Sequence, residues 1–396
     1  MKIAIFSDNF YPELSGISDS IITLAKELVK SGNKINFYAP RYSAKDYKKA
    51  KFIQQELNLG ENVKINRWFS FHYPSGTGQA RLALPNPLHW ASLKKFNPDI
   101  IHTQLFFGIG LDALISAKIN RIPIVGTNHT AITEFVRYSP IKTEWFKKII
   151  MKYVVWYYNH CDYVSAPSQS VFDEMEQFGF KRPHKVISNP INFDIFNSAS
   201  LNYNMQKFKK ESGLSGATLV CAGRLSPEKN IDVIIRALAL VKQRFPEVIL
   251  VLAGHGSAAN GLKTLARKLG VEKSVKFLGT VDQLTLAGLY RASELFVISS
   301  TSETQSMTLI QAMACGLPAV GVRARALPEY INDQRGFLVE PNNHVAFAEK
   351  IMILLENSAL RKKFGENAAI FVKRFSAPNI AKEWEIVYSE VISNRL

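Results

Sequence analysis

Short apolar runs alternate with amphipathic stretches in the first half of this 396-residue chain. Five of the runs have the length and composition of buried strands. They lie at residues 2–6, 34–39, 100–103, 122–127 and 163–166. Helical stretches such as residues 18–30 separate them. Because parallel strands need long crossover connections, this order predicts an α/β domain built on a parallel sheet.

The same order starts again in the second half. We expect a helix at residues 230–244 and further strands at 218–222, 248–253, 275–278, 295–298, 319–321 and 336–339. Between the halves, residues 187–197 contain the turn Asn189-Pro190 and no long apolar periodicity, which indicates a linker. We therefore predict domains at residues 1–192 and 193–376. An amphipathic helix within 377–396 follows them, and we expect it to cross back to the first domain.

Lysine and arginine outnumber aspartate and glutamate by 49 to 33, which gives a net charge of +16. Residues 41–152 hold 17 basic and 7 acidic residues, so +10 of this charge is concentrated in about a quarter of the chain. Such a concentration of positive charge indicates an anionic partner or an anionic surface, or only a soluble protein of basic composition. A nucleic-acid-binding protein would also carry this charge.

The cysteines and the hydropathy of the chain indicate the cellular compartment of the protein. The three cysteines are odd in number and widely spaced, which fits neither a disulfide framework nor a zinc site and indicates a reducing compartment. The chain opens on a strand pattern rather than a secretory signal. The apolar stretch 149–158 is interrupted by Lys152 and is far shorter than the roughly 18 residues of a membrane span. We expect a cytoplasmic protein without a transmembrane helix.

Two strand ends carry candidate phosphate-binding loops. The first strand leads through Ser15 and Gly16 into a helix, whose free N–H groups attract anions, although a plain structural turn fits equally well. In the second half, Gly223, Arg224 and Lys229 follow a strand, at the sheet edge where ligands of α/β proteins bind. The two cations could converge on one diphosphate, and a solvated basic loop is the alternative.

A third segment, residues 299–318, joins a strand to a helix through small polar residues. Glu303 precedes the turn, and Gln311 lies two helical turns further on. Glu303 can accept hydrogen bonds from sugar hydroxyls, while the N–H groups of the loop and helix start can hold phosphates. The loop and helix start comprise Thr304, Gln305, Ser306, Met307 and Thr308. A purely structural helix would not require a carboxylate in this loop.

Together with Gly254-His255-Gly256, the segments at 223–230 and 303–318 make the sequence resemble glycosyltransferase family 4 over nearly its whole length. These are retaining enzymes of GT-B fold, so the resemblance implies two Rossmann-like domains that face each other across a cleft. It implies that Arg224 and Lys229 bind the donor diphosphate and that Glu303 contacts the transferred sugar. The loops of Ser15, Gly16 and Gly254 would belong to the same donor site.

Two further positions are interpreted through the family. His129, in Val125-Gly126-Thr127-Asn128-His129-Thr130, matches a first-domain histidine that faces the donor sugar, although a lone histidine can also be structural. Gln311 stands where the family usually has a second glutamate that binds the donor ribose, so ribose affinity is in question.

The resemblance implies retention of configuration without a metal, and the chain has no Asp-x-Asp cluster to hold one. The acceptor would attack on the leaving-group face, and a donor phosphate oxygen would take its proton. Arg224, Lys229 and helix N–H groups would neutralise the leaving diphosphate.

Residues 142–158 indicate which class of acceptor the protein uses. In this segment, cations and aromatic residues are interspersed as they are in helices that lie at a membrane interface. Trp145, Lys147, Lys148, Lys152 and Trp156 are the candidate membrane and acceptor residues, and a core helix with extended lysines is the alternative. Residues 128–130 and 302–305 resemble the branch that acts on diacylglycerol.

The sequence thus predicts a peripheral hexosyltransferase at the inner face of the cell membrane, which transfers glucose from UDP-glucose to a lipid. It is predicted to need no cofactor and to bind no nucleic acid. The alternatives are a transferase of lipopolysaccharide or polysaccharide assembly and, remotely, a non-enzymatic nucleic-acid-binding protein.

Overall fold

The computed structural model of the protein describes residues 1–13, 15–50, 53–72, 81–131, 143–197 and 205–394. Lys142, Arg395 and Leu396, which belong to the segments 142–158 and 377–396 named above, lie outside these ranges. The chain forms two compact units. Unit 1 comprises Met1–Pro190 and Ala377–Leu396, and unit 2 comprises Ile191–Ser376.

Unit 1 is built on a seven-stranded parallel sheet in the order β3-β2-β1-β6-β7-β8-β9. Its strands are β1 (Lys2–Phe6), β2 (Lys34–Pro40), β3 (Val63–Trp68), β6 (Ile100–Thr103), β7 (Ile124–Thr127), β8 (Tyr163–Ala166) and β9 (His184–Val186). A separate antiparallel hairpin pairs β4 (Phe71–His72) with β5 (Arg81–Leu82). The strands not predicted, β3 and β9, lie at the two edges of the sheet and carry polar residues, so they lack the apolar runs of the central strands.

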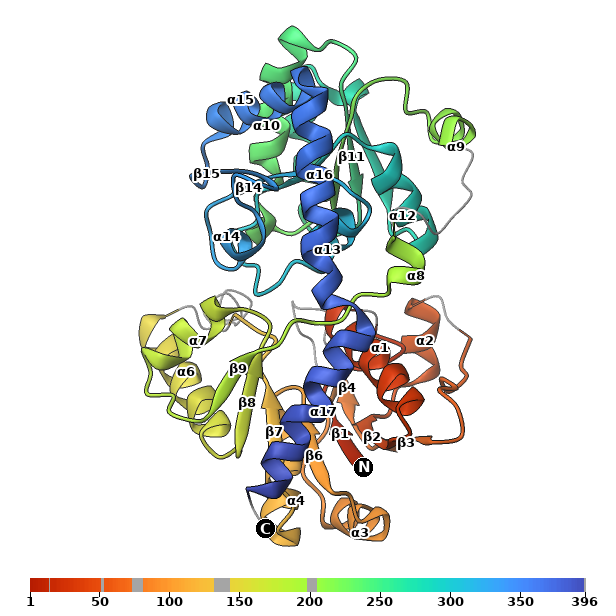
Figure 1. Cartoon of the computed structure of the whole chain (residues 1–396), viewed down its shortest axis with the longest axis vertical. Helices are drawn as coiled ribbons and strands as arrows, with labels where there is room; N and C mark the ends of the chain where they lie inside the picture. The colour runs from red at the N-terminus through yellow and green to blue at the C-terminus, as the bar shows by residue number, and fades with distance from the viewer. Residues whose placement is uncertain (14, 51–52, 73–80, 132–142, 198–204, 395–396) are drawn as a thin grey trace. The chain divides into compact units, whose positions relative to one another are not determined.

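Seven helices of unit 1 fall in the described residues. They are α1 (Gly16–Lys30), α2 (Ala44–Lys49), α3 (Pro87–Phe96), α4 (Gly108–Asn120), α6 (Glu144–Tyr158), α7 (Gln169–Glu176) and α17 (Ala377–Ser393). The C-terminal helix α17 packs against α1 and buries Trp384 and Tyr388 in unit 1 (Figure 1). The predicted return of the last helix to the first domain is therefore confirmed.

Unit 2 has a six-stranded parallel sheet in the order β12-β11-β10-β13-β14-β15. Its strands are β10 (Thr218–Ala222), β11 (Ile249–Ala253), β12 (Val275–Gly279), β13 (Leu295–Ile298), β14 (Ala319–Val322) and β15 (Gly336–Val339). Its α-helices are α8 (Phe193–Phe196), α9 (Met205–Glu211), α10 (Ile231–Arg244), α11 (Ala259–Lys268), α12 (Gln283–Ala292), α13 (Met307–Ala314), α14 (Leu327–Tyr330), α15 (His344–Glu356) and α16 (Ser358–Val372). Short 3₁₀ turns are η2 (Pro227–Lys229), η3 (Glu272–Ser274) and η4 (Lys373–Phe375).

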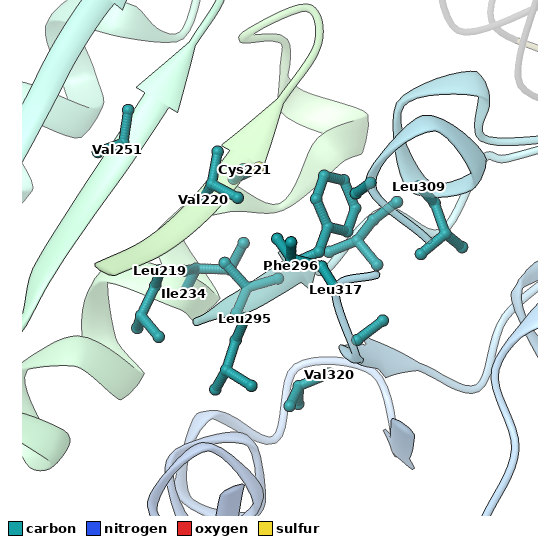
Figure 2. Packing of buried hydrophobic residues seen from close by; sticks show 14 of the residues in the cluster. Leu219, Val220, Cys221, Ile234, Val251, Leu295, Phe296, Leu309, Leu317 and Val320 are labelled. Carbon is teal, nitrogen blue, oxygen red and sulfur yellow. The ribbon is translucent and has the colours of Figure 1, made fainter. Parts of the chain in front are cut away.

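The hydrophobic core of unit 2 explains why the sequences of its strands are continuously apolar. Side chains from the sheet and from helices α10 and α13 fill it, among them Leu219, Phe296, Ile234 and Leu309 (Figure 2). Because β10 and β13 have sheet neighbours on both sides and helices cover the faces, their residues are buried whichever way they point.

The strand order reverses between β1 and β6 in unit 1 and between β10 and β13 in unit 2. At such a point the connections leave in opposite directions, and the carboxyl ends of the two strands leave room for a ligand. In both units these edges carry the polar loops singled out in the sequence. Among the described residues, no helix is both long and apolar enough to span a membrane.

Candidate functional site

In unit 2, where the strand order reverses between β10 and β13, hydrogen bonds join the loop after β10 to the loop after β13. The hydroxyl of Ser299 donates to the carbonyl oxygens of Lys229 and Asn230, at 2.9 and 2.8 Å. The Asn230 side chain donates to the hydroxyl of Thr301 at 3.2 Å. The structure therefore brings together the two segments that the sequence separates by about seventy residues.

Lys229 and Glu303 form an ion pair in which Nζ lies 2.6 Å from Oε1. The side chains keep 22% and 11% of their surface exposed, so the pair is sheltered but not sealed from a ligand. A hydrogen bond between ionised groups is stronger than a neutral one, and this pair orients the two side chains toward one point at the sheet edge.

Arg224 is held less tightly. Its Nη2 lies 3.3 Å from Oε1 of Glu228, and its side chain is about half exposed. Glu228 itself is buried and accepts a hydrogen bond of 2.5 Å from the Ser226 hydroxyl. A buried carboxylate thus anchors one end of a guanidinium that still reaches solvent.

Gly223 and Gly254 let two loops approach closely. Their φ angles are +133° and +147°, in the region that side chains disfavour. A Cβ on Gly254 would lie 1.8 Å from the carbonyl oxygen of Gly223. Gly254 therefore has a packing role beside the loop of Arg224, whether or not it also contacts a ligand.

The N-terminus of α13 lies after Glu303, beyond Thr304 and Gln305. Ser306 is the N-cap, and its hydroxyl accepts a hydrogen bond from the N–H of Leu309 at 3.3 Å. Because the N–H of Leu309 is hydrogen-bonded to Ser306, it is not available to a ligand. A phosphate would have to accept hydrogen bonds from earlier N–H groups, such as those of Met307 and Thr308. Gln305 is buried, Thr304 is partly buried, and Gln311 is half-buried in the second turn of α13.

In unit 1, Ser15 caps α1 and Gly16 is its first residue. The Ser15 hydroxyl accepts from the N–H of Ser18 at 3.2 Å and donates to Oδ1 of Asn9 at 2.9 Å. These bonds tie the start of α1 to the loop that leaves β1. The candidate loop of Ser15 and Gly16 thus lies at the carboxyl edge of the sheet.

His129 follows β7 and is buried. Its Nε2 lies 2.8 Å from Oε1 of Gln104. Since a carboxamide oxygen can only accept, Nε2 carries the proton and Nδ1 is the acceptor of the ring. Burial lowers the pKa of His129 from 6.5 to about 4, so the imidazole is neutral at pH 7.

Gln104 was not found from the sequence, because a single glutamine after a strand carries no motif. It follows β6, the neighbour of β7, so only the strand order reveals that it lies beside His129.

A buried network links α17 to the same sheet edge. Nδ1 of His102 lies 2.6 Å from the Tyr388 hydroxyl, and its Nε2 lies 2.7 Å from the Thr127 hydroxyl. Burial, with a smaller contribution from the neighbouring His129, lowers the pKa of His102 to about 3. The C-terminal helix is thereby linked, through His102, to Thr127 at the end of β7, two residues before His129. The sequence did not indicate this link, which spans 286 residues.

Asp8, in the loop after β1, has a structural partner. Its carboxylate accepts hydrogen bonds from the N–H groups of Ile109 and Gly110, at 2.8 and 3.1 Å, at the start of α4. Burial raises its pKa to about 6. A protein carboxylate therefore occupies this helix N-terminus.

Helix α6 has two different faces. Its buried face consists of Met151, Val154, Val155, Tyr157 and Tyr158. Its exposed side chains include Trp145, Lys148, Ile149, Lys152 and Trp156, which we call the α6 stripe, together with the carboxylate of Glu144. The fifth predicted residue, Lys147, is only partly exposed and lies 3.7 Å from Glu144. The helix packs on the core with one face and presents cations and aromatic rings with the other, and contact of the exposed face with a membrane stays a prediction.

Among the residues that the structure describes, no three His, Cys, Asp or Glu side chains are grouped as metal ligands. The three cysteines are buried and unbridged.

Two family models match the chain. Residues 14–195 match "Glycosyltransferase Family 4", and residues 204–371 match "Glycosyl transferases group 1". Among curated relatives, alpha-monoglucosyldiacylglycerol synthase of Streptococcus pneumoniae is 30% identical over 340 residues, 84% of this chain and 74% of that protein. The enzyme of the same name from Acholeplasma laidlawii is 24% identical and covers 99% of this chain and 98% of its own length.

Solved structures share the fold. Anabaena HepE in complex with UDP superposes with a TM-score of 0.77 at 22% identity, covering 98% of this chain and 100% of its own. Sucrose-phosphate synthase of Thermosynechococcus elongatus gives 0.77 at 16% identity, with 99% of both chains covered. These structures confirm the predicted GT-B fold. The sequence matches confirm the predicted family: the chain belongs to the glycosyltransferases that join a Family 4 domain to a group 1 domain.

Proposed function

We propose that this glycosyltransferase transfers glucose from UDP-glucose to a membrane lipid such as diacylglycerol. The observation that carries the proposal is the Lys229–Glu303 pair beside the N-terminus of α13. It offers a cation and N–H groups for a diphosphate and a carboxylate for sugar hydroxyls. The Streptococcus and Acholeplasma relatives are named for glucosyldiacylglycerol synthesis, and UDP is bound in the Anabaena neighbour.

In the proposed mechanism, the acceptor hydroxyl attacks the anomeric carbon from the face that the diphosphate leaves, and the configuration is retained. The bond between the anomeric carbon and the phosphate oxygen breaks as the new glycosidic bond forms. The acceptor proton passes to an oxygen of the departing diphosphate. Lys229, Arg224 and the first N–H groups of α13 offset the growing negative charge, so the step needs no metal.

The remaining site residues receive supporting roles in this proposal. Glu303 orients the hexose through its hydroxyls, and the neutral His129 accepts a hydrogen bond from the same sugar. Gln311 receives a ribose hydroxyl through its amide oxygen but contributes no charge, and Ser15 and Gly16 approach the phosphates. Unit 2 would bind the donor, and unit 1 would bind the acceptor.

The proposed location is the anionic inner face of the cell membrane, which the α6 stripe would contact. If this is right, Lys148→Glu with Lys152→Glu should weaken binding to phosphatidylglycerol vesicles roughly 30-fold, since each basic side chain contributes about 1 kcal/mol at such a surface. Vesicle sedimentation measures the effect. The matched control is Lys268→Glu with Lys273→Glu, exposed lysines of unit 2 whose replacement changes the net charge equally. Equal loss in both variants would show that only total charge matters.

The substrate assignment is tested by mass spectrometry of products formed from a panel of nucleotide sugars with membrane lipid extract. A hexosyl diacylglycerol formed from UDP-glucose is the expected product. A product found only with saccharide or lipid-linked saccharide acceptors would instead favour the role in polysaccharide or lipopolysaccharide assembly.

A further inference from the structure

Unit 1 carries a second apolar surface, distant in sequence from the α6 stripe. We call it the hairpin patch, and it consists of Phe69, Phe71, Leu84 and Leu88. These side chains are 70%, 50%, 57% and 77% exposed. The rings of Phe69 and Phe71 contact each other edge to face, with centroids 4.9 Å apart. Four large apolar side chains exposed within twenty residues are more than the isolated ones normal at a protein surface.

The register of the hairpin explains why Phe69, Phe71 and Leu84 point outward together, while Leu88 lies in the first turn of α3. Phe71 pairs with Leu82, and continuing this antiparallel register sets Phe69 opposite Leu84. Directly opposed residues share one face of a hairpin. Of the residues that alternate with them, Ser70 and Ala83 are buried, whereas His72 at the end of β4 is exposed. A slip of one residue would reverse this pattern, so the buried partners hold the aromatic residues at the surface.

The buried side of the hairpin is attached firmly to unit 1. The Ser70 hydroxyl donates to the carbonyl oxygen of Arg41 at 2.6 Å, and Ala83 belongs to the apolar core. A Cβ on Gly108 would lie 1.6 Å from the Ala83 carbonyl oxygen, which shows how closely α4 approaches the hairpin. The patch is therefore presented by a backbone that is held in place.

The charges beside the patch are cationic. Arg41, Lys45 and Lys48 are exposed, and the backbone N–H of Arg41 donates to the Trp68 carbonyl oxygen at 2.7 Å, next to Phe69. The one acidic residue of α2, Asp46, is mostly buried and paired with Arg81 of β5. The surroundings of the patch thus offer positive charge to an incoming partner, while the nearby carboxylate is already neutralised.

We propose that the hairpin patch inserts into the interface of an anionic bilayer, so that unit 1 meets the membrane through the hairpin as well as through the α6 stripe. Exposed phenylalanine and leucine flanked by arginine and lysine suit the boundary between acyl chains and anionic headgroups. The inference rests on the proposed lipid acceptor. It assigns to Phe69, Phe71, Leu84 and Leu88 a contact that positions the enzyme at its substrate.

The contact is measured directly with an environment-sensitive fluorophore on a Phe71→Cys variant. The native cysteines are buried and burial raises the pKa of each thiol, so labelling is selective for the introduced one. An Ile370→Cys variant in unit 2, at a side chain 65% exposed, is the matched control. With phosphatidylglycerol vesicles we expect a blue shift and at least a doubling of fluorescence for the Phe71→Cys label alone. Pure phosphatidylcholine vesicles should give a weaker change.

A Phe69→Ser/Phe71→Ser variant gives the functional readout. Its partitioning onto phosphatidylglycerol vesicles should fall at least fivefold, with an equal fall in transfer to an acceptor embedded in vesicles. Transfer to a short-chain acceptor dispersed in detergent should not change, because the donor-binding loops of unit 2 are untouched.

Several outcomes would overturn the inference. One is an unshifted Phe71→Cys label on protein that sediments with the vesicles, and another is protein that does not sediment with them at all. A lipid-free dimer that the serine variant dissociates would assign the patch to a second copy of the chain. If the label shifts but no lipid acceptor is glycosylated, the membrane contact stands and the proposed acceptor fails.

Discussion

Replacing Lys229 by methionine should lower kcat/KM for glucosyl transfer by a factor of about 10² to 10³, the usual cost of removing one charge-stabilising donor. Lys229 lies 2.6 Å from Glu303 and is the most sheltered cation at the carboxyl edge of β10. Its charge would act mainly as the diphosphate departs, so kcat should fall more than KM rises. Steady-state kinetics with UDP-glucose and a lipid acceptor measure the changes in kcat and in KM separately.

A stability measurement separates this catalytic role from a structural one. Lys229→Met leaves the sheltered Glu303 carboxylate without its cation, which should cost about 1 kcal/mol, toward the lower end for a lost partner because both groups keep some solvent contact. Adding Glu303→Gln removes the unpaired charge, so the double variant should regain stability while activity stays low.

Urea unfolding followed by far-UV circular dichroism reports these changes. All five tryptophans lie in unit 1, so their fluorescence follows that unit and should not change in variants of unit 2. Activity that recovers together with stability in the double variant would contradict the proposed role of the pair and leave it structural.

Gln104→Glu should introduce an acid limb into the pH–rate profile that the wild-type protein lacks. In the wild type, burial lowers the pKa of His129 to about 4, so the ring stays neutral from pH 8 to pH 5. A carboxylate beside Nε2 favours the imidazolium and raises that pKa. If the raised pKa exceeds 6.5, activity should fall about tenfold by pH 5.5, because only the neutral ring can accept a hydrogen bond.

As the pH is lowered, the free energy of unfolding should change in opposite directions in the wild type and in Gln104→Glu. In the wild type, the folded pKa of His129 lies below the unfolded value of 6.5, so the unfolded chain binds more protons between about pH 4 and pH 6.5. Stability therefore falls as the pH drops through this window. In Gln104→Glu, a folded pKa above 6.5 would make stability rise as the pH drops toward 6.5.

Other buried groups of unit 1 have shifted pKa values and also change stability with pH, which is why the two proteins must be compared with each other. Burial raises the pKa of Asp8 and of Asp19 to about 6, and burial lowers that of the adjacent His102 to about 3. Because these groups are common to both proteins, their contributions cancel, and the difference in tryptophan-detected unfolding reports the coupled titration of His129 and the carboxylate introduced by Gln104→Glu. Gln104→Leu is the control, since it removes the acceptor oxygen without adding a charge and should reduce activity equally at all pH values. Identical pH profiles in wild type and Gln104→Glu would rule out a role for the neutral ring.

Local pattern was enough to predict the central sheets. The strands 2–6 and 218–222 were expected with the bounds that the structure has, because strands buried on both faces are apolar throughout. The edge strands β3 and β9 and the short hairpin were not expected, since half-exposed strands carry mixed residues. The motif loops after β10 and β13 were found because a carboxylate and two cations in small-residue turns have no role in packing.

The amino-acid sequence alone was sufficient to establish a family 4 glycosyltransferase of α/β class and to nominate Arg224, Lys229 and Glu303, because that chemistry lies in short contiguous motifs. The tertiary structure decided which of these groups touch. It paired Lys229 with Glu303, set Gln104 against His129 and connected Tyr388 to His102. It also showed that register, by burying Ser70 and Ala83, turns Phe69 and Phe71 outward. Such relations depend on strand order and burial, which join residues far apart in the chain and leave no local pattern.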